Sequence, residues 1–225
     1  MHFSMHYGMY NMVDGMNMIS CMIKIMHNFT LCLIYLILVS VISLSYFMFK
    51  KKTYLKFNNN TSAELVWTIM PLLLLFAMGI PSFTLLYSME SKKHSDLTYK
   101  AIGHQWYWSY EGNDIIEHNI ESYMNSNVDF GMNRLLEVDN KLLLPYNSTI
   151  QMIVTSEDVL HSWALPNLGT KIDAVPGRLN SIMVSSVYPG NFYGQCSEIC
   201  GINHSFMPIS VEFGSWKSFF MNLNN

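Results

Sequence analysis

The order of apolar and polar positions divides the chain into a membrane-like N-terminal part and a strand-rich remainder. Residues 29–49 form an uncharged stretch of 21 residues, and residues 65–89 form a second one of 25 residues. At 1.5 Å per residue, helices over these stretches are about 31 Å and about 37 Å long, enough to cross the hydrocarbon core of a bilayer. Pro71 and Pro81 inside the second stretch are tolerated in a membrane, where neighbouring groups satisfy the carbonyls that a proline frees. We therefore predict a hairpin of two transmembrane helices.

The connection between the two stretches, residues 50–64, predicts how the hairpin is oriented. It contains four lysines, Lys50, Lys51, Lys52 and Lys56. By the positive-inside rule this loop faces the cytoplasm or its organellar equivalent. Both termini, and the domain that follows the second helix, are then expected on the opposite side of the membrane.

Residues 90–225 show short strand-like segments in place of long helical periodicity. The segments cover residues 98–110, 134–138, 149–155, 179–187 and 207–213. Turn signals such as Val175-Pro176-Gly177 separate them. This pattern predicts a β-sandwich or barrel, followed by a brief amphipathic helix over residues 215–223.

Composition and charge narrow the class of protein. Charged residues make up 13% of the 225 residues, hydrophobic ones 50%, and the mean hydropathy is +0.18, which excludes disorder and an ordinary soluble domain. Residues 1–89 carry five lysines against two acidic residues, whereas residues 90–225 carry eight basic residues against fourteen acidic ones. An acidic domain on a basic-loop anchor argues against nucleic acid as a partner.

The N-terminal segment, residues 1–28, is rich in methionine. Its methionines recur at helical spacing beside His2 and His6, at Met1, Met5, Met9, Met12 and Met16. One interpretation is a thioether arm that captures copper. Because 18 methionines are spread over the whole chain, we favour a flexible interfacial segment and assign it no function.

The segment 194–208 carries the most specific chemistry. It places Cys196 and Cys200 four residues apart, His204 four residues further on, and Met207 three residues beyond that, while His161 precedes Ser162-Trp163. Zinc sites use cysteine and histidine but have no use for a thioether. Soft sulfur ligands combined with imidazoles and a weak methionine select copper.

The number of cysteines distinguishes between kinds of copper site. A blue-copper centre needs one cysteine, so the second is explained if both sulfur atoms bridge two copper ions, each capped by one histidine. Such a site suits electron transfer and has no vacant position for a substrate. The alternative, a Cys196–Cys200 disulfide that fixes a loop, explains neither His204 nor Met207.

This segment closely resembles the binuclear copper A loop of cytochrome c oxidase subunit II in its mitochondrial form. Matching blocks extend over roughly residues 63–213, at residues 103–111, 134–140, 157–166, 173–180, around Glu64, Trp67 and Pro71, and at Pro81-Ser82. The resemblance implies a transmembrane hairpin of two helices followed by an all-β, cupredoxin-like Greek-key domain. The corresponding divisions are residues 1–28, the hairpin at 29–89, and the copper-binding domain at 90–225.

The resemblance also implies a ligand set. Cys196 and Cys200 would bridge two copper ions, with His161 and His204 as terminal ligands. Met207 and the backbone carbonyl of Glu198 would be weak axial ligands. The Glu198 carboxylate would also reach a magnesium ion shared with subunit I.

Further roles follow from the same resemblance. Trp106 would be the residue at which electrons enter from cytochrome c, although its spacing from Trp108 alone suggests two core aromatics on one side of a strand. Glu64 would take part in proton uptake, although a carboxylate favoured at a helix start explains it equally well. Six acids would form a surface that docks cytochrome c: Glu111, Asp114, Glu117, Glu121, Asp139 and Asp158.

The function implied is that of the electron-accepting subunit of a haem–copper terminal oxidase, cytochrome c oxidase. Electrons would pass to haem a in subunit I, which also holds haem a3 and copper B and, with subunit III nearby, reduces oxygen to water coupled to proton translocation. The location implied is the mitochondrial inner membrane, among membrane lipid, with the β-domain and both termini in the intermembrane space.

Two other functions compete with this one. A membrane-anchored copper chaperone would have one anchor and a thioredoxin-like fold, and a quinol oxidase subunit would share the fold without copper. Two copper ions per chain are expected for the first function, one or fewer for the chaperone and none for the quinol oxidase subunit.

Overall fold

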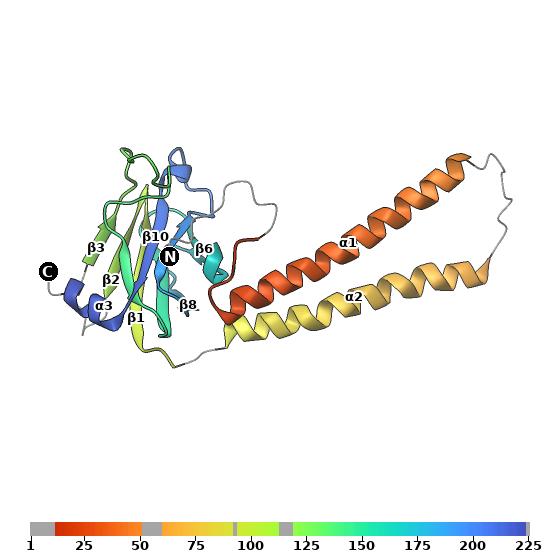
Figure 1. Ribbon diagram of the computed structural model, residues 1–225, viewed down its shortest axis with the longest axis horizontal. Helices are drawn as coiled ribbons and strands as arrows, with labels where there is room; N and C mark the ends of the chain where they lie inside the picture. The colour runs from red at the N-terminus through yellow and green to blue at the C-terminus, as the bar shows by residue number, and fades with distance from the viewer. Residues whose placement is uncertain (1–11, 51–59, 92–93, 113–118, 224–225) are drawn as a thin grey trace. The chain divides into compact units, whose positions relative to one another are not determined.

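The protein consists of two compact units. The computed structural model describes residues 12–50, 60–91, 94–112 and 119–223. One unit, Met22–Met89, holds most of the two long helices, α1 (Met18–Lys50) and α2 (Thr61–Glu90) (Figure 1). The other combines Met1–Cys21 with Glu90–Asn225 and holds the strands.

Both predicted transmembrane helices are present and extend beyond the apolar stretches. α1 begins at Met18, eleven residues before the uncharged stretch, and α2 begins at Thr61 and ends at Glu90. Asn60 caps α2, because its side-chain oxygen accepts a hydrogen bond from the Ala63 N–H at 3.2 Å. Neither apolar window is buried inside the protein, as expected for side chains that face lipid.

The prediction that the N-terminal segment is flexible and interfacial is wrong for residues 16–20. Met16 is 4% exposed, and its backbone N–H donates to the Asn167 carbonyl at 3.1 Å. The side chain of Asn17 caps α1 by accepting from the Ser20 N–H at 2.8 Å, and its amide donates to the Leu168 carbonyl. These buried contacts attach the first turn of α1 to the β-domain. Met1, Met5 and Met9 lie outside the described residues.

The β-domain contains three sheets in the described part of the chain. Its strands are β1 (Leu97–His104), β2 (Tyr107–Gly112), β3 (Asn119–Ser122), β4 (Leu142–Pro145), β5 (Ile150–Ser156), β6 (His161–Leu165), β7 (Thr170–Ala174), β8 (Asn180–Val184), β9 (Gly190–Gln195) and β10 (Pro208–Gly214). The strand orders are β3-β2-β1-β5-β8, β4-β10-β9 and β6-β7. Two 3-10 turns, η1 (Pro166–Leu168) and η2 (His204–Phe206), follow β6 and precede β10.

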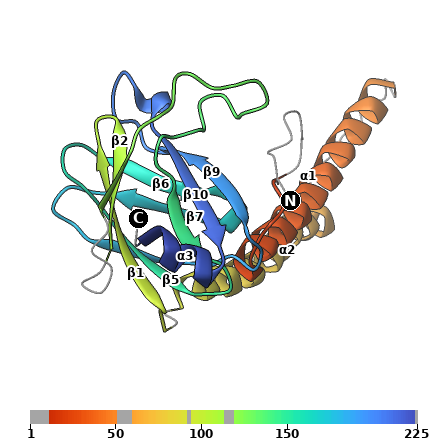
Figure 2. The same ribbon diagram turned by 60° about the vertical axis from the view of Figure 1, so that its left-hand side comes forward.

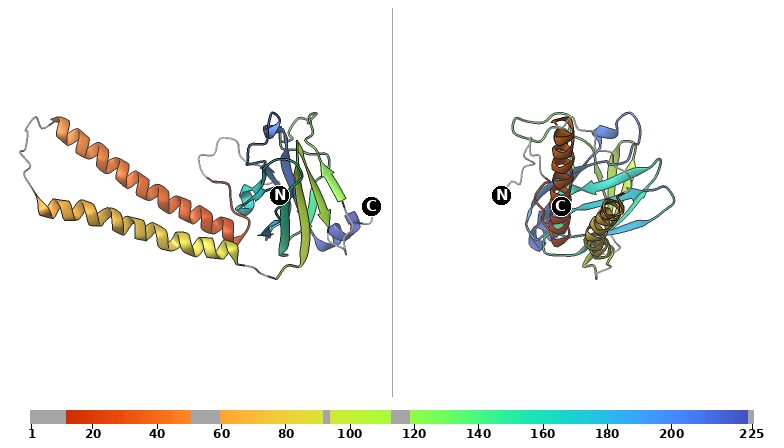
Figure 3. Two further views of the ribbon diagram at one scale, coloured as in Figure 1. Left: turned by 180° about the vertical axis from the view of Figure 1, so that it is seen from behind. Right: turned by 90° about the vertical axis from the view of Figure 1, so that its right-hand side faces the viewer.

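The core lies between these sheets. Alternate residues of β5 point inward, so that Ile150, Met152 and Val154 are fully buried. The indoles of Trp108 and Trp163 are also fully buried. The predicted terminal helix is present as α3 (Trp216–Leu223), which packs on β4 and β10 (Figure 2) and is seen from behind in Figure 3.

Two strand predictions are wrong. Residues 98–110 form a hairpin, β1 and β2, with Gln105 and Trp106 in its turn. Trp106 and Trp108 therefore do not share a strand. Residues 134–138 form no named strand; only Val138 makes an isolated bridge, with Met124.

Candidate metal centre

The predicted copper loop connects two neighbouring antiparallel strands. β9 ends at Gln195, β10 begins at Pro208, and these two residues are paired across the sheet. Cys196 and Met207 therefore leave the sheet side by side. Antiparallel pairing fixes both ends of the loop, so the ligands between them are confined to a small volume.

A glycine brings this loop to the strand that carries His161. A Cβ atom on Gly194 would lie 1.8 Å from the backbone oxygen of Ala164, so no larger residue fits between β9 and β6. Past this contact, the Ser197 N–H donates to the Ser162 carbonyl at 3.1 Å. The close approach of β9 and β6 sets Cys196 beside His161.

The predicted ligands meet in one place. The ligand atoms of His161, Cys196 and Cys200 all lie within 4.8 Å of one another, and all three residues are buried. Cys196 Sγ lies 3.8 Å from His161 Nδ1 and 3.3 Å from the Glu198 carbonyl oxygen.

The other half of the cluster gathers around the second thiol. Cys200 Sγ lies 3.4 Å from His204 Nδ1 and 3.4 Å from Met207 Sδ. Both cysteines are free thiols, which rules out the disulfide alternative in this structure. The two sulfur atoms thus each face one imidazole.

The two thiols differ in acidity. Burial raises the pKa of Cys196, but its hydrogen bond to His161 and further backbone hydrogen bonds outweigh burial and lower that pKa to about 7. Burial and the neighbouring Cys196 raise the pKa of Cys200 to about 12. Burial lowers the pKa of His161, and hydrogen bonds to Cys196 and Asp158 more than reverse this, so the pKa is raised. In the metal-free chain, both shifts favour an ionised pair of Cys196 and His161.

This donor set fits copper. It offers two sulfur atoms that become thiolates on metal binding, two imidazole nitrogens turned toward them, and a thioether. A buried pair of thiolates needs positive charge nearby, which bound copper would supply. A zinc site would leave the thioether of Met207 without a role.

Comparisons with known proteins identify the family. Residues 97–214 match the model of the cytochrome c oxidase subunit II periplasmic domain, and residues 4–85 match that of its transmembrane domain. The cytochrome c oxidase subunit 2 of Myxine glutinosa is 54% identical over 159 residues, which cover 69% of each chain. The chain belongs to the cytochrome c oxidase subunit II family.

Two solved structures resemble the β-domain. The periplasmic domain of subunit II from Bradyrhizobium japonicum is 45% identical, with a TM-score of 0.56 over 59% of this chain and 94% of that one. A mixed-disulfide intermediate between the thioredoxin-like protein TlpA and subunit II is 43% identical, with a TM-score of 0.52 over 60% and 93%. Family and fold confirm the two-helix hairpin with a β-domain and the electron-accepting role in a haem–copper oxidase, and exclude the thioredoxin-like chaperone.

The β1–β2 turn lies against the predicted copper loop. The Trp106 indole N–H and the Gln105 side-chain amide both donate to the Cys200 carbonyl, at 3.3 Å and 2.8 Å. The Trp106 side chain is half-buried. It is therefore neither a fully buried core residue nor a fully exposed one. The sequence offered no signal for Gln105 beyond its place next to Trp106.

Asp158, predicted to be a docking acid, lies beside His161 in the candidate metal centre. Its carboxylate accepts hydrogen bonds from the Gln105 backbone N–H at 2.6 Å and from His161 Nε2 at 2.8 Å. Burial raises its pKa, but the hydrogen bonds from His161, Val159 and Gln105 outweigh this and lower it.

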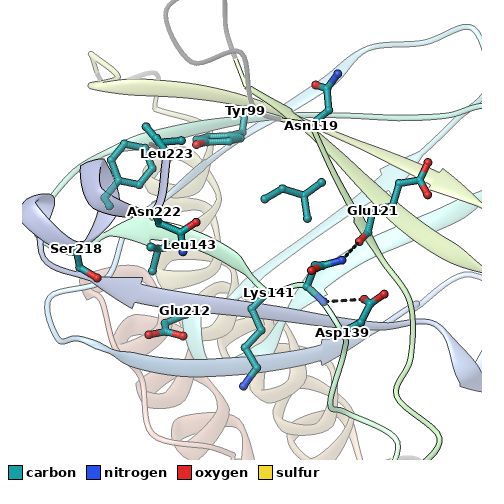
Figure 4. Close-up of a pocket in the computed structure, with 13 residues that line it drawn as sticks. Tyr99, Asn119, Glu121, Asp139, Lys141, Leu143, Glu212, Ser218, Asn222 and Leu223 are labelled. Carbon is teal, nitrogen blue, oxygen red and sulfur yellow. Dashed lines mark hydrogen bonds between the residues drawn. The ribbon is translucent and has the colours of Figure 1, made fainter. Parts of the chain in front are cut away.

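Three other predicted docking acids share one side of the domain. Glu111 and Glu121 line one cavity of about 510 Å³, and Glu121 and Asp139 line another of about 460 Å³ beside α3 (Figure 4). Glu111 is paired with Lys100 at 2.9 Å. Glu157 also lines the first cavity. It was not among the docking acids predicted from the sequence, although it directly precedes Asp158. Asp114 and Glu117 lie outside the described residues.

The remaining predicted site residue, Glu64, belongs to the helical unit. It lies in the first turn of α2, and its backbone N–H donates to the Asn60 carbonyl at 3.0 Å. This is where a carboxylate stabilises a helix start, so its position agrees with the simpler of its two interpretations.

Proposed function

We propose that this chain accepts electrons from cytochrome c at a binuclear copper centre and passes them to haem a in subunit I. The observation that carries the proposal is the buried convergence of His161, Cys196 and Cys200, with His204 and Met207 beside them. When bound, the copper pair would supply a one-electron redox centre. The subunit itself would not reduce oxygen; haem a3 and copper B in subunit I would do so.

The roles of the ligands follow their contacts. Cys196 and Cys200 would hold both ions through their sulfur atoms, and His161 and His204 would each hold one. Met207 and the Glu198 carbonyl are weak ligands, because one is a neutral thioether and the other a backbone oxygen. The chain would bind the ions, orient their ligands and keep water away from them. Cys196 and Cys200 are only 6% and 4% exposed. A preformed site of this kind needs little rearrangement when an electron arrives.

Glu198 is proposed to have a second role. Its side chain is half-buried, in the loop between the two cysteines. A carboxylate oxygen is the kind of ligand that magnesium takes. Glu198 would hold a magnesium ion at the boundary with subunit I, through the carboxylate, while its carbonyl faces Cys196.

Cytochrome c is the proposed electron donor. Glu111, Glu121 and Asp139 give one side of the domain a negative potential, which attracts a basic protein and raises its association rate. Asp114 and Glu117 are proposed to extend this surface. Trp106 would receive the electron, since its indole bonds to the carbonyl of the proposed ligand Cys200.

The location follows from the two membrane helices and the proposed partners. The chain would lie in the mitochondrial inner membrane beside subunits I and III, with its β-domain in the intermembrane space. The lysine-rich connection after Lys50 would face the opposite side. Glu64, near that connection, is proposed to assist proton uptake for the oxidase's proton translocation.

The state of the thiols suggests a step before copper insertion. A relative of this subunit forms a mixed disulfide with a thioredoxin-like protein. Because Cys196 and Cys200 lie close together and are free, we propose that they are kept reduced by a partner of that class until copper binds.

Metal content tests the proposal. The full chain, purified in detergent and loaded with copper, should hold two copper ions and show a mixed-valence spin-resonance signal with seven lines. One ion per chain would contradict a binuclear centre, and none would favour a quinol oxidase subunit. The proposed magnesium site is tested separately, with manganese in place of magnesium in the assembled oxidase. Glu198→Gln should lose the bound manganese, whereas the control Glu212→Gln should keep it.

A further inference from the structure

We propose that Asp158 is a positioning residue for His161 and that it ties this copper ligand to the turn that carries Trp106. The inference rests on the proposed copper centre. It gives Asp158 a role at the metal site, beyond the docking role that the sequence suggested.

The carboxylate of Asp158 is surrounded by donors. Oδ1 accepts from His161 Nε2 at 2.8 Å and from the Val159 N–H at 2.5 Å, and Oδ2 accepts from the Gln105 N–H at 2.6 Å. Although its side chain is 32% exposed, both oxygens are thus engaged. A carboxylate that only attracts cytochrome c needs no hydrogen-bond donors of its own. A carboxylate that holds the ring of His161 in place must itself be held, as Asp158 is.

The imidazole of His161 is fixed from three sides. Nε2 is bonded to Asp158, Nδ1 faces Cys196 Sγ at 3.8 Å, and the side chain is fully buried. A Cβ on Gly103 would lie 2.8 Å from His161 Cδ2, so β1 leaves only enough room for the ring. With its proton on Nε2 and donated to the carboxylate, His161 would present the Nδ1 lone pair to a bound metal ion.

Two connections now join the Trp106 turn to the two halves of the cluster. The Trp106 indole and the Gln105 amide bond to the Cys200 carbonyl, while the Gln105 backbone N–H bonds to the Asp158 carboxylate, which holds His161. A shift of the turn would therefore act on both halves. A carboxylate that accepts a hydrogen bond from a metal-binding histidine fixes the ring of that histidine and raises its basicity.

The variant Asp158→Asn tests the role. Asparagine keeps the shape but has one acceptor oxygen and one donor group, so it cannot accept from both His161 Nε2 and the Gln105 N–H. We expect copper to bind about 10- to 100-fold more weakly, measured by competition with a copper(I) chelator on the full chain in detergent. Asp139→Asn is the matched control, because it removes the same charge without contact to His161, and its copper affinity should stay within about twofold of the unchanged chain.

A second readout separates positioning from general stability. In proton magnetic resonance of the copper-loaded chain, Asp158→Asn should move the hyperfine-shifted signals of His161 and leave those of His204 in place. In the unchanged chain, the Nε2 proton of His161 should exchange with deuterium far more slowly than that of His204. Asp158→Glu, which keeps both acceptor oxygens, should recover part of the lost affinity.

The outcomes are distinct. Unchanged copper affinity and unchanged His161 signals in Asp158→Asn would overturn the inference while leaving the copper centre intact. If the unchanged chain bound no copper, the proposed function would fall, and the inference with it. If circular dichroism showed Asp158→Asn to be unfolded, proton exchange in the unchanged chain would decide: equal exchange at the two histidines overturns the inference.

Discussion

The proposed copper loop and the proposed docking surface on the acidic side of the β-domain would serve one electron path, but they are built on different principles. In the loop, Cys196 and Cys200 are buried and held within 4.8 Å of His161 by three strands. On the acidic side, Glu111 and Asp139 stand at the surface with partners of their own.

This difference sets the range over which each region acts. Ligands act through bonds, so a displacement of about 1 Å disables them. Surface carboxylates act through a field that extends over about a Debye length, close to 10 Å at 0.1 M salt. We expect changes in the loop to be severe and insensitive to salt, and changes on the acidic side to be mild and salt-dependent.

The largest effect is expected from Cys196→Ser. A hydroxyl cannot supply the soft bridging thiolate, so the seven-line signal and electron transfer from cytochrome c should both disappear at every ionic strength. Cys21→Ser, a change to an exposed thiol in α1, is the control and should leave both intact. A seven-line signal that persisted in Cys196→Ser would show that Cys196 is not a bridge.

A second test uses the difference in acidity between the two thiols. In the metal-free chain at pH 7, iodoacetamide should modify Cys196 roughly a hundredfold faster than Cys200, because the thiolate is the nucleophile, although a more acidic thiolate is intrinsically less reactive. Both residues are similarly buried, so access does not explain the ratio.

The pH profile makes this test specific. With its pKa lowered to about 7, Cys196 gains thiolate as the pH rises from 6 to 8, while Cys200, at about 12, does not. Peptide mapping by mass spectrometry separates these sites from Cys21 and Cys32. Faster labelling of Cys200 would contradict the assignment of the ionised pair.

The sequence carries enough information for the ligands but not for their surroundings. Cys196, Cys200, His204 and Met207 lie within twelve residues, so their chemistry and spacing already suggest a copper site. The two apolar stretches are equally local signals. Both features depend on residue type and local sequence, and hardly on tertiary packing.

The features that could not be predicted depend on packing between distant segments. β6 is buried at all five positions and therefore lacks the alternation that reveals a strand. Residues 98–110 look like one strand because their turn, Gln105-Trp106, contains neither proline nor glycine. The burial of Met16 depends on contacts with residues more than 150 positions away.

A third, smaller effect is expected from Gly194→Ala. The new methyl group would overlap the Ala164 carbonyl, so β9 and β6 must separate, and the free energy of unfolding should fall by about 1–3 kcal/mol. Gly214→Ala is the matched control, since the atoms nearest its Cβ would belong to the Leu143 and Ser218 side chains, at 3.3 Å or more. Thermal melts of the metal-free full chain compare the two; equal stabilities would show that the close approach is not required.

The smallest effect, and the one that sharpens the contrast between the two regions, is expected from Asp139→Asn. Asparagine keeps an acceptor oxygen for the Tyr123 and Asn140 N–H groups, so that only the charge is removed. In the assembled oxidase, cytochrome c oxidation should slow about two- to threefold at low ionic strength and recover at high ionic strength, because salt screens exposed charges. An equal loss in high salt would mean that Asp139 acts through structure, like the residues of the copper loop, and the distinction between a bonded site and a steering surface would fail at this position.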